Sequence, residues 1–232
     1  LRRAIGWRIG RGAVADARKK LDPHPARARL AKVGTMAMMD VTHAYGSLPT
    51  NNNLQVQFDG RELVNAAAIA KPDRETGRAN LVGNKACFAC SIGCGRIASI
   101  DPNHFSVKDK PKYQKSLGGL EYESIYAVGP MCGVDDIDAA TYASALCNEH
   151  GMDPISFGAS VAAAMELYDI GAITKEHTGG MALEFGSAEA LAWAAEVTGT
   201  ATGFGKDIGL GSKRICEKYG HPDLAMAVKG QE

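Results

Sequence analysis

Three cysteines stand within eight residues in the run Cys87-Phe-Ala-Cys90-Ser-Ile-Gly-Cys94, and their type and spacing suit metal binding. Thiolates this close in sequence can converge on one centre, and the small residues between them let the backbone wrap around it. Iron–sulfur clusters take cysteine thiolates, usually four to a cluster. The spacing therefore favours an iron–sulfur cluster held by Cys87, Cys90 and Cys94.

Other uses of these cysteines stay open from spacing alone. Zinc sites also use Cys-x2-Cys, but normally as two separated pairs, and no second pair occurs here. Inert or disulfide-bonded cysteines are the weaker alternative, because nothing indicates secretion. A fourth ligand could be Cys132, Cys147 or Cys216. Cys132 is the best of these, because the other two fall within expected helices, where a free cysteine is commonly buried.

Two carboxylates at alternate positions, Glu121 and Glu123, form a second feature. A carboxylate drawn into an apolar pocket has a raised pKa and can act as an acid or base near neutral pH. The alternative, which spacing alone favours, is a solvated or salt-bridged pair.

The third feature is the run from Asn148 to Pro154, where one expected helix ends and the next begins. Gly151 suits the position after a helix end, and Asp153-Pro154 suits an N-cap followed by the first helical residue. The free N–H groups of a helix start can receive a polar ligand. The more common alternative is that Asp153 only caps its own helix.

We expect most of the secondary structure around these residues to be helical. Apolar periodicity and cap residues predict helices over residues 1–21, 61–70, 136–150, 153–169, 187–197 and 206–219. Pro23 and Pro25 predict a break over residues 22–30. Alternation at Leu54, Val56 and Phe58 suggests an extended segment, residues 83–98 read as loop-rich, and residues 101–119 read as a solvent-exposed loop. One mainly α domain is the simplest arrangement.

Composition narrows the function classes. The 232 residues carry 26 basic and 26 acidic side chains, so no basic excess points to a nucleic-acid surface. No run of about 18 apolar residues predicts a membrane span. We expect a cytoplasmic protein, and the opening Leu1-Arg2-Arg3 reads as a chain entered partway along.

These features occur together, and in this order, in one known family. The segment Lys85-Ala-Cys87-Phe-Ala-Cys90-Ser-Ile-Gly-Cys94-Gly-Arg96 resembles the cluster-binding segment of the aldehyde:ferredoxin oxidoreductases, which are tungstopterin enzymes. Glu121-Tyr-Glu123-Ser resembles their acidic motif beside the tungsten. Asn148-Glu-His-Gly151-Met-Asp153 resembles their pterin-contacting Asp-x-x-Gly-Leu-Asp, and Gly46-Ser-Leu-Pro-Thr-Asn-Asn52 their Gly-x-Leu-Pro-Thr-x-Asn. The match spans about residues 34–220.

The resemblance implies roles for particular residues. Cys87, Cys90 and Cys94 would hold three irons of a [4Fe–4S] cluster, with the fourth cysteine in a later domain. Glu123 would be the carboxylate near tungsten, a catalytic acid or base. The pterin contacts would come from Asn148, Gly151, Met152 and Asp153. Asn148 and Met152 depart from the family's Asp and Leu, and asparagine cannot carry the negative charge.

The resemblance also implies an architecture and a reaction. Residues 1–232 would form an irregular helical domain like the family's middle domain, without the N-terminal pterin-cradling domain or the C-terminal domain. The reaction would oxidise an aldehyde to a carboxylic acid at a tungsten or molybdenum bis-pterin centre, with Mg²⁺ as a further candidate ion. Electrons would leave through the cluster to ferredoxin or a partner subunit of an oligomer.

Two other functions stay open. One is a tungsten subunit of the benzoyl-CoA reductase type, from the same family. The other is a non-catalytic iron–sulfur or zinc module, which metal analysis separates from an enzyme.

Overall fold

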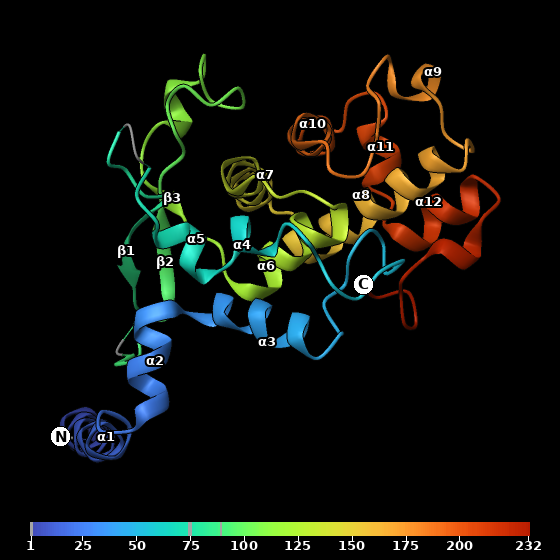
Figure 1. Cartoon of the computed structure of the whole chain (residues 1–232). Coiled ribbons are helices and arrows are strands. Elements are labelled where there is room, and N and C mark those ends of the chain that lie inside the picture. The colour runs from blue at the N-terminus through green and yellow to red at the C-terminus, as the bar shows by residue number, and fades with distance from the viewer. Residues whose placement is uncertain (1, 74–75, 89) are drawn as a thin grey trace.

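Helices make up most of the molecule, and a single small sheet lies at one side of them (Figure 1). The computed structural model describes residues 2–73, 76–88 and 90–232, with side chains from residue 10 onward. The expected mainly α fold is confirmed. No helix in these ranges is long and apolar enough to cross a membrane.

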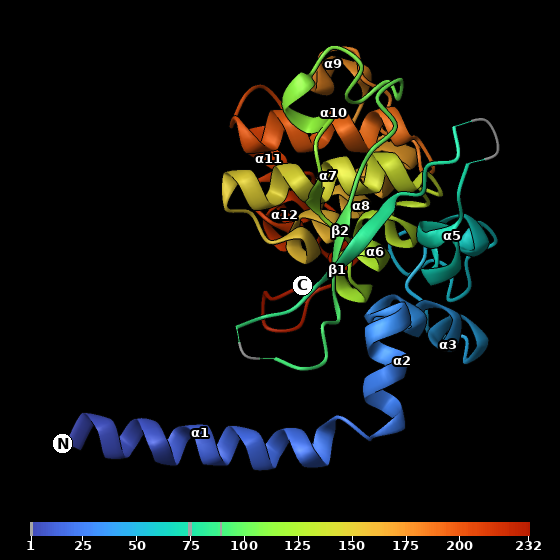
Figure 2. The same cartoon turned by 90° about the vertical axis from the view of Figure 1, so that its left-hand side faces the viewer.

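The N-terminal part is a chain of helices that leads into the body. Helix α1 (Arg2–Leu21) projects away from the rest, and α2 (Pro25–Val33) joins it to η1 (Thr35–Ala37) and α3 (Met38–Ala44) (Figure 2). The expected helix over 1–21 is confirmed. The break expected over 22–30 is shorter than predicted, because α2 already begins at Pro25. Pro25 begins α2, because proline at the first helical position gives up an N–H that has no partner there anyway.

Residues 46–70 turn tightly instead of extending. Three consecutive residues, Asn51, Asn52 and Asn53, have positive φ angles of 48°, 51° and 63°. They reverse the chain, so that Thr50 pairs with Gln55 in an isolated bridge, and the expected extended segment at 54–58 is wrong. The expected helix over 61–70 is two short helices, α4 (Arg61–Val64) and α5 (Ala66–Ala70).

The sheet has three antiparallel strands in the order β1-β2-β3, formed by Leu81–Lys85, Gly95–Ala98 and Leu117–Gly118. Lys85 pairs with Gly95 and Asn84 with Arg96, so the cysteine run forms the connection of a hairpin. We call residues 86–94 the cysteine loop. The loop-rich expectation for 83–98 is right between the strands and wrong at its two ends.

Residues 101–116, expected as an exposed loop, pack against the helical half. Ser106 and Val107 are buried, and η2 (Pro111–Tyr113) lies within this segment. Lys110 donates to the hydroxyl of Tyr142 at 3.0 Å and also pairs with Glu196, which ties the segment to α7 and α10. His104 Nε2 lies 3.0 Å from Asp136 Oδ2.

The His104–Asp136 pair gives the fold a pH dependence. Burial alone lowers the pKa of His104, but Asp136 and two nearby aspartates raise it overall. Burial raises the pKa of Asp136, but His104 and backbone N–H groups lower it overall. The pair therefore stabilises the fold between the two folded pKa values, and its contribution is lost as pH rises through that of His104 or falls through that of Asp136.

We expect His104→Gln to lower the free energy of unfolding by about 1.5 kcal/mol near pH 5, because it removes a hydrogen bond to a charged group. The difference from the unmodified protein should shrink above the raised pKa of His104. Urea unfolding at several pH values measures this, and an equal loss at every pH would contradict it.

The helical half contains the main core. Its elements are α6 (Tyr122–Val128), η3 (Pro130–Cys132), α7 (Ile137–His150), α8 (Pro154–Asp169), α9 (Lys175–Thr178), α10 (Ala188–Gly199), α11 (Gly205–Ile208), α12 (Ser212–Lys218) and η4 (Pro222–Leu224). The helices expected over 136–150, 153–169 and 187–197 are confirmed, with Asp136, Asp153 and Ser187 as N-caps. The helix expected over 206–219 is wrong, because Gly209–Gly211 divides it into α11 and α12.

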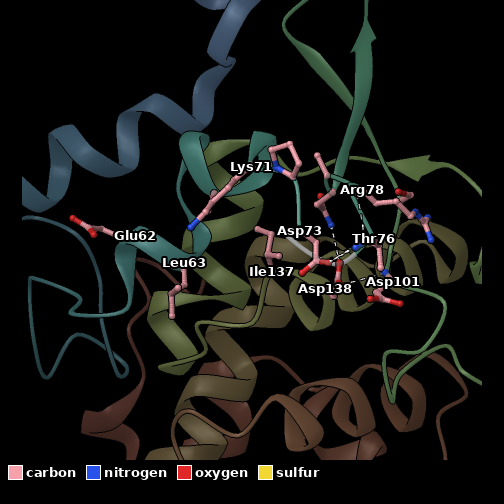
Figure 3. Close-up of a pocket in the computed structure, with 14 residues that line it drawn as sticks. Glu62, Leu63, Lys71, Asp73, Thr76, Arg78, Asp101, Ile137 and Asp138 are labelled. Atoms are coloured by element: carbon pink, nitrogen blue, oxygen red, sulfur yellow. Dashed lines mark hydrogen bonds between the residues drawn. The ribbon is translucent and has the colours of Figure 1, made fainter.

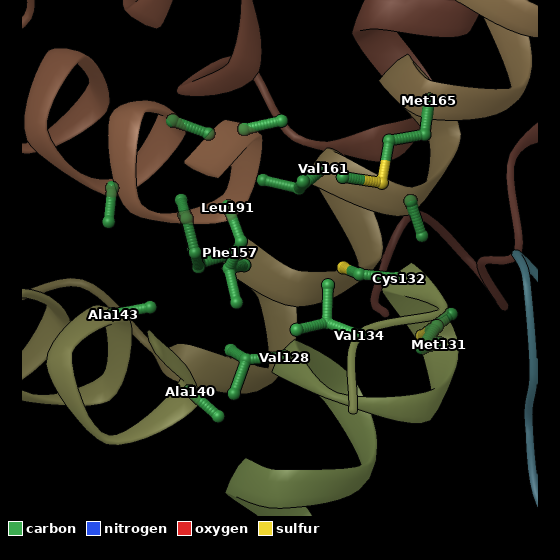
Figure 4. Packing of buried hydrophobic residues seen from close by; sticks show 14 of the residues in the cluster. Val128, Met131, Cys132, Val134, Ala140, Ala143, Phe157, Val161, Met165 and Leu191 are labelled. Atoms are coloured by element: carbon green, nitrogen blue, oxygen red, sulfur yellow. The ribbon is translucent and has the colours of Figure 1, made fainter. Parts of the chain in front are cut away.

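Small residues let these helices approach closely. Apolar side chains from α6, η3, α7, α8 and α10 fill the core shown in Figure 4. A Cβ atom on Gly158 of α8 would lie 2.5 Å from the backbone of Ala127 in α6. The crossing thus packs the last turn of α6 against the first half of α8, and the starts of both helices carry candidate site residues.

Candidate functional site

The cysteine loop places its thiols at the surface. Cys87 is exposed, and Cys90 and Cys94 are partly exposed. The backbone N–H of Cys90 donates to the carbonyl of Cys87 at 3.0 Å, and the N–H of Ile92 donates to the sulfur of Cys90 at 3.4 Å. Hydrogen bonds from the N–H groups of Ile92 and Gly93 lower the pKa of Cys90, which favours the thiolate needed for metal binding.

The donor set of the cysteine loop is compatible with an iron–sulfur cluster. All six cysteines are free thiols. In the described ranges, no three His, Cys, Asp or Glu side chains are arranged to hold one metal ion. A four-iron cluster needs its thiolates spread around it, one to an iron, so accessible thiols along one loop are compatible with it.

The other three cysteines belong to the core. Cys132 is fully buried beside Val134 and Val161 (Figure 4), and its thiol donates to the carbonyls of Ala127 and Gly158 at 3.4 and 3.5 Å. Burial raises the pKa of Cys147 to about 12 and that of Cys216 to about 11. A thiolate is costly in such surroundings, so the ranking of Cys132 as the best internal fourth ligand is not supported.

The acidic motif lies at the start of α6. Glu121 is the N-cap residue, and its carboxylate accepts from the hydroxyl of Thr35 at 3.4 Å. The same hydroxyl accepts from the N–H of Tyr122 at 2.9 Å. Glu123 is exposed in the first helical turn, where the helix dipole favours a negative charge. Within this chain Glu123 therefore lies outside any apolar pocket.

The corner between α7 and α8 has the expected local geometry. Gly151 has a φ of 69° and ends α7, and its N–H donates to the carbonyl of Cys147. The carboxylate of Asp153 accepts from the N–H of Ile155 at 3.2 Å and the hydroxyl of Ser156 at 3.3 Å, so it caps α8. The side chains of Asn148 and Asp153 are exposed, and that of Met152 is partly buried.

The start of α6 connects the three motifs. On one side, Glu121 Oε1 lies 3.7 Å from the position that a Cβ atom would take on Gly95, directly after the cysteine loop. On the other side, burial raises the pKa of Tyr126, and the charges of Glu123 and Asp153 raise it further. Glu123 and Asp153 thus both lie near Tyr126, although they are far apart in sequence.

Arg96 is a buried residue to which the motifs alone assign no role. Its guanidinium donates to Asn84 Oδ1 at 2.6 Å and to the carbonyls of Leu30 and Ala31 at 3.3 and 3.4 Å. It stands two residues after Cys94, at the end of the segment that resembles the cluster-binding segment of the family.

A separate cavity of about 500 Å³ lies between α4, α5, residues 71–73 and 76–80, and the start of α7 (Figure 3). Asp138 accepts there from Asn80 Nδ2 at 3.0 Å and from the N–H of Asp101 at 3.2 Å. Burial raises the pKa of Asp138. None of the predicted site residues lines this cavity.

Comparison with known proteins agrees with the sequence motifs. Residues 12–232 match the family model described as aldehyde ferredoxin oxidoreductase, domains 2 & 3. The chain is 35% identical over 205 residues to the tungsten-containing aldehyde ferredoxin oxidoreductase of Pyrococcus furiosus, covering 88% of this chain and 31% of that protein. Its counterpart in Pyrococcus abyssi is 33% identical, over 92% of this chain and 33% of the relative. The chain thus spans about a third of these curated relatives.

A solved structure shows the same fold. It is the active site complex BamBC of benzoyl coenzyme A reductase with 1,5-dienoyl-CoA, matched with a TM-score of 0.65. The match covers 87% of this chain and 28% of the other at 16% identity, so it supports the fold alone. With the family model matching nearly the whole sequence, the chain belongs to the aldehyde ferredoxin oxidoreductase family.

Proposed function

We propose that this chain is the part of a tungsten-pterin oxidoreductase that holds three cysteines of a [4Fe–4S] cluster and one side of the pterin site. The observation that carries the proposal is the cysteine loop. It presents three free, accessible thiols and is followed by Gly95, which lies beside Glu121, while the remaining cysteines are buried. The fourth ligand and the other pterin contacts come from outside these 232 residues, which correspond to the family's middle domain.

The proposed reaction is oxidation of an aldehyde to a carboxylate. When bound, a tungsten or molybdenum bis-pterin group supplies the two-electron chemistry, which belongs to the cofactor and not to the protein. Glu123 takes up or gives a proton at its carboxylate. An exposed carboxylate at a helix start suits this, because substrate and neighbouring domains can approach it.

The α7–α8 corner is the proposed pterin contact. Gly151 offers backbone without a side chain, Met152 an apolar surface, and Asp153 a carboxylate already oriented by its cap. Asn148 stands where the family has an aspartate, and its amide can donate or accept hydrogen bonds to the pterin without carrying a charge. Cys87, Cys90 and Cys94 would hold the cluster, which would supply one-electron transfer to ferredoxin or a partner subunit, and Mg²⁺ is a further candidate ion.

Metal analysis of the complete polypeptide tests this function. We expect about four iron and four labile sulfide per polypeptide, together with tungsten or molybdenum. Aldehydes should reduce a viologen dye in its presence. Zinc without iron would refute the proposal and point to a structural module, and iron without tungsten or molybdenum would point to an electron carrier. Turnover of benzoyl-CoA but not of aldehydes would assign the benzoyl-CoA reductase type instead.

A further inference from the structure

The side chain of Arg96 fastens the cysteine loop to α2. Arg96 lies on β2, is only 3% exposed, and donates to two carbonyls at the end of α2. Its hairpin partner Asn84 donates to the same Ala31 carbonyl at 2.5 Å and accepts from Arg96. Both strands that flank the cysteine loop are therefore bonded to one helix end. Figures 1 and 2 both show α2 beside these strands.

Two glycines make room for this arginine. A Cβ atom on Gly34 would lie 2.5 Å from Arg96 Nη2, and one on Gly119 would lie 2.4 Å from Arg96 Cβ. Gly119 also donates its N–H to the carbonyl of Arg96 at 2.9 Å. Gly34 thus lies against the guanidinium, and Gly119 lies against the backbone and Cβ of Arg96, which is the arrangement of a fixed group and not of a surface side chain.

The charge of this guanidinium lacks a paired carboxylate. Among the described residues, no carboxylate lies within 4.0 Å of it as an ion-pair partner. Arg96 stands two residues after Cys94, and arginine keeps its proton in proteins. A buried positive charge without a partner is costly, so a negative group beside Cys94 would relieve that cost.

Glu121 opposes Arg96 at the same place. Its carboxylate interacts with the Arg96 charge and lies beside Gly95, the residue between Cys94 and Arg96. The end of the cysteine loop therefore lies near the positive charge of Arg96 and the negative charge of Glu121. A negative charge added at this place would be stabilised by Arg96 and destabilised by Glu121.

We propose that Arg96 is a positioning residue that holds the cysteine loop on α2 and raises the reduction potential of the bound cluster, with Glu121 lowering it. This inference rests on the proposed function. Reduction adds one electron, and so one negative charge, to the cluster. A fixed positive charge stabilises the reduced form more than the oxidised form, and net charge is a recognised determinant of cluster potential.

A redox titration of the complete polypeptide tests the inference, with dithionite supplying electrons through mediators and the reduced cluster followed by EPR. At the midpoint potential of the unmodified protein, Arg96→Gln should lower the reduced-to-oxidised ratio about tenfold, equivalent to about 59 mV for one electron. Glu121→Gln should raise the same ratio. Arg96→Lys retains the charge and should stay within about threefold of the unmodified protein.

A matched control is Arg29→Gln, which removes an exposed arginine from α2. It should leave the reduction potential of the cluster unchanged. Hydrogen exchange of residues 84–97 in the cluster-free protein gives an independent readout. It should speed up in Arg96→Gln but not in Glu121→Gln, because Arg96 bonds the hairpin to α2, whereas Glu121 accepts from Thr35 of η1.

Each outcome has one meaning. An Arg96→Gln protein that keeps its iron and its potential overturns the inference. If that variant loses iron, Glu121→Gln decides, and an unchanged potential there overturns it. An unmodified protein without iron and sulfide defeats the proposed function and this inference together, whereas a normal cluster with unshifted potentials defeats this inference alone.

Discussion

Replacing Cys90 by alanine should abolish iron binding in the complete polypeptide. Cys90 is the central cysteine of the loop, and its sulfur accepts the backbone hydrogen bond that favours the thiolate. Two remaining thiolates from this loop are too few for a cluster that takes four in all. Iron and labile sulfide should fall from about four per polypeptide to near zero, measured by metal analysis and visible absorbance.

The matched control is Cys216→Ala, which removes a buried thiol from α12. It should keep its iron and lose only about 1 kcal/mol in the free energy of unfolding. Normal iron in Cys90→Ala would show that the cysteine loop holds no cluster.

Replacing Glu123 by glutamine should slow aldehyde oxidation about 10²- to 10⁴-fold, the usual contribution of a general acid or base. The amide keeps the size of the side chain but cannot exchange a proton near neutral pH. Iron and tungsten content should not change, because Glu123 is an exposed side chain and is not one of the proposed cluster ligands. Steady-state turnover with a viologen acceptor measures the effect.

Glu176→Gln is the control for this variant, because Glu176 is likewise an exposed carboxylate in the first turn of a helix. It should turn over at the unmodified rate. If Glu123→Gln also did so, the carboxylate would have no role in proton transfer.

The sequence predicts the helices of the second half well because their signals are local. Asp136, Asp153 and Ser187 each cap a helix from a neighbouring position, and Gly151 ends one. The sequence does not predict the sheet, because Gly83, Asn84 and Gly95 are poor strand formers. In addition, the segment between β2 and β3 is long, so their pairing is not local. Pairing across such distances leaves no periodic trace in the sequence.

The sequence also predicts only part of the candidate site. The cysteine run, the acidic motif and the α7–α8 corner are visible as short motifs. The burial of Arg96 is not, because its acceptors Leu30 and Ala31 stand more than sixty residues earlier in the chain. The nearness of Asp153 to Tyr126 likewise depends on how α6 crosses α8.

The accessibility of the cysteine loop has a consequence for handling the enzyme in air. Cys87, Cys90 and Cys94 are free and reachable by solvent, and Cys90 is biased toward the thiolate. Thiolates that lose their metal are the species that oxygen and peroxide convert to sulfenic acid, which then condenses with a neighbouring thiol. A cluster lost to oxidation would thus leave a cross-linked loop, and restoring it would require a thiol reductant before fresh iron and sulfide.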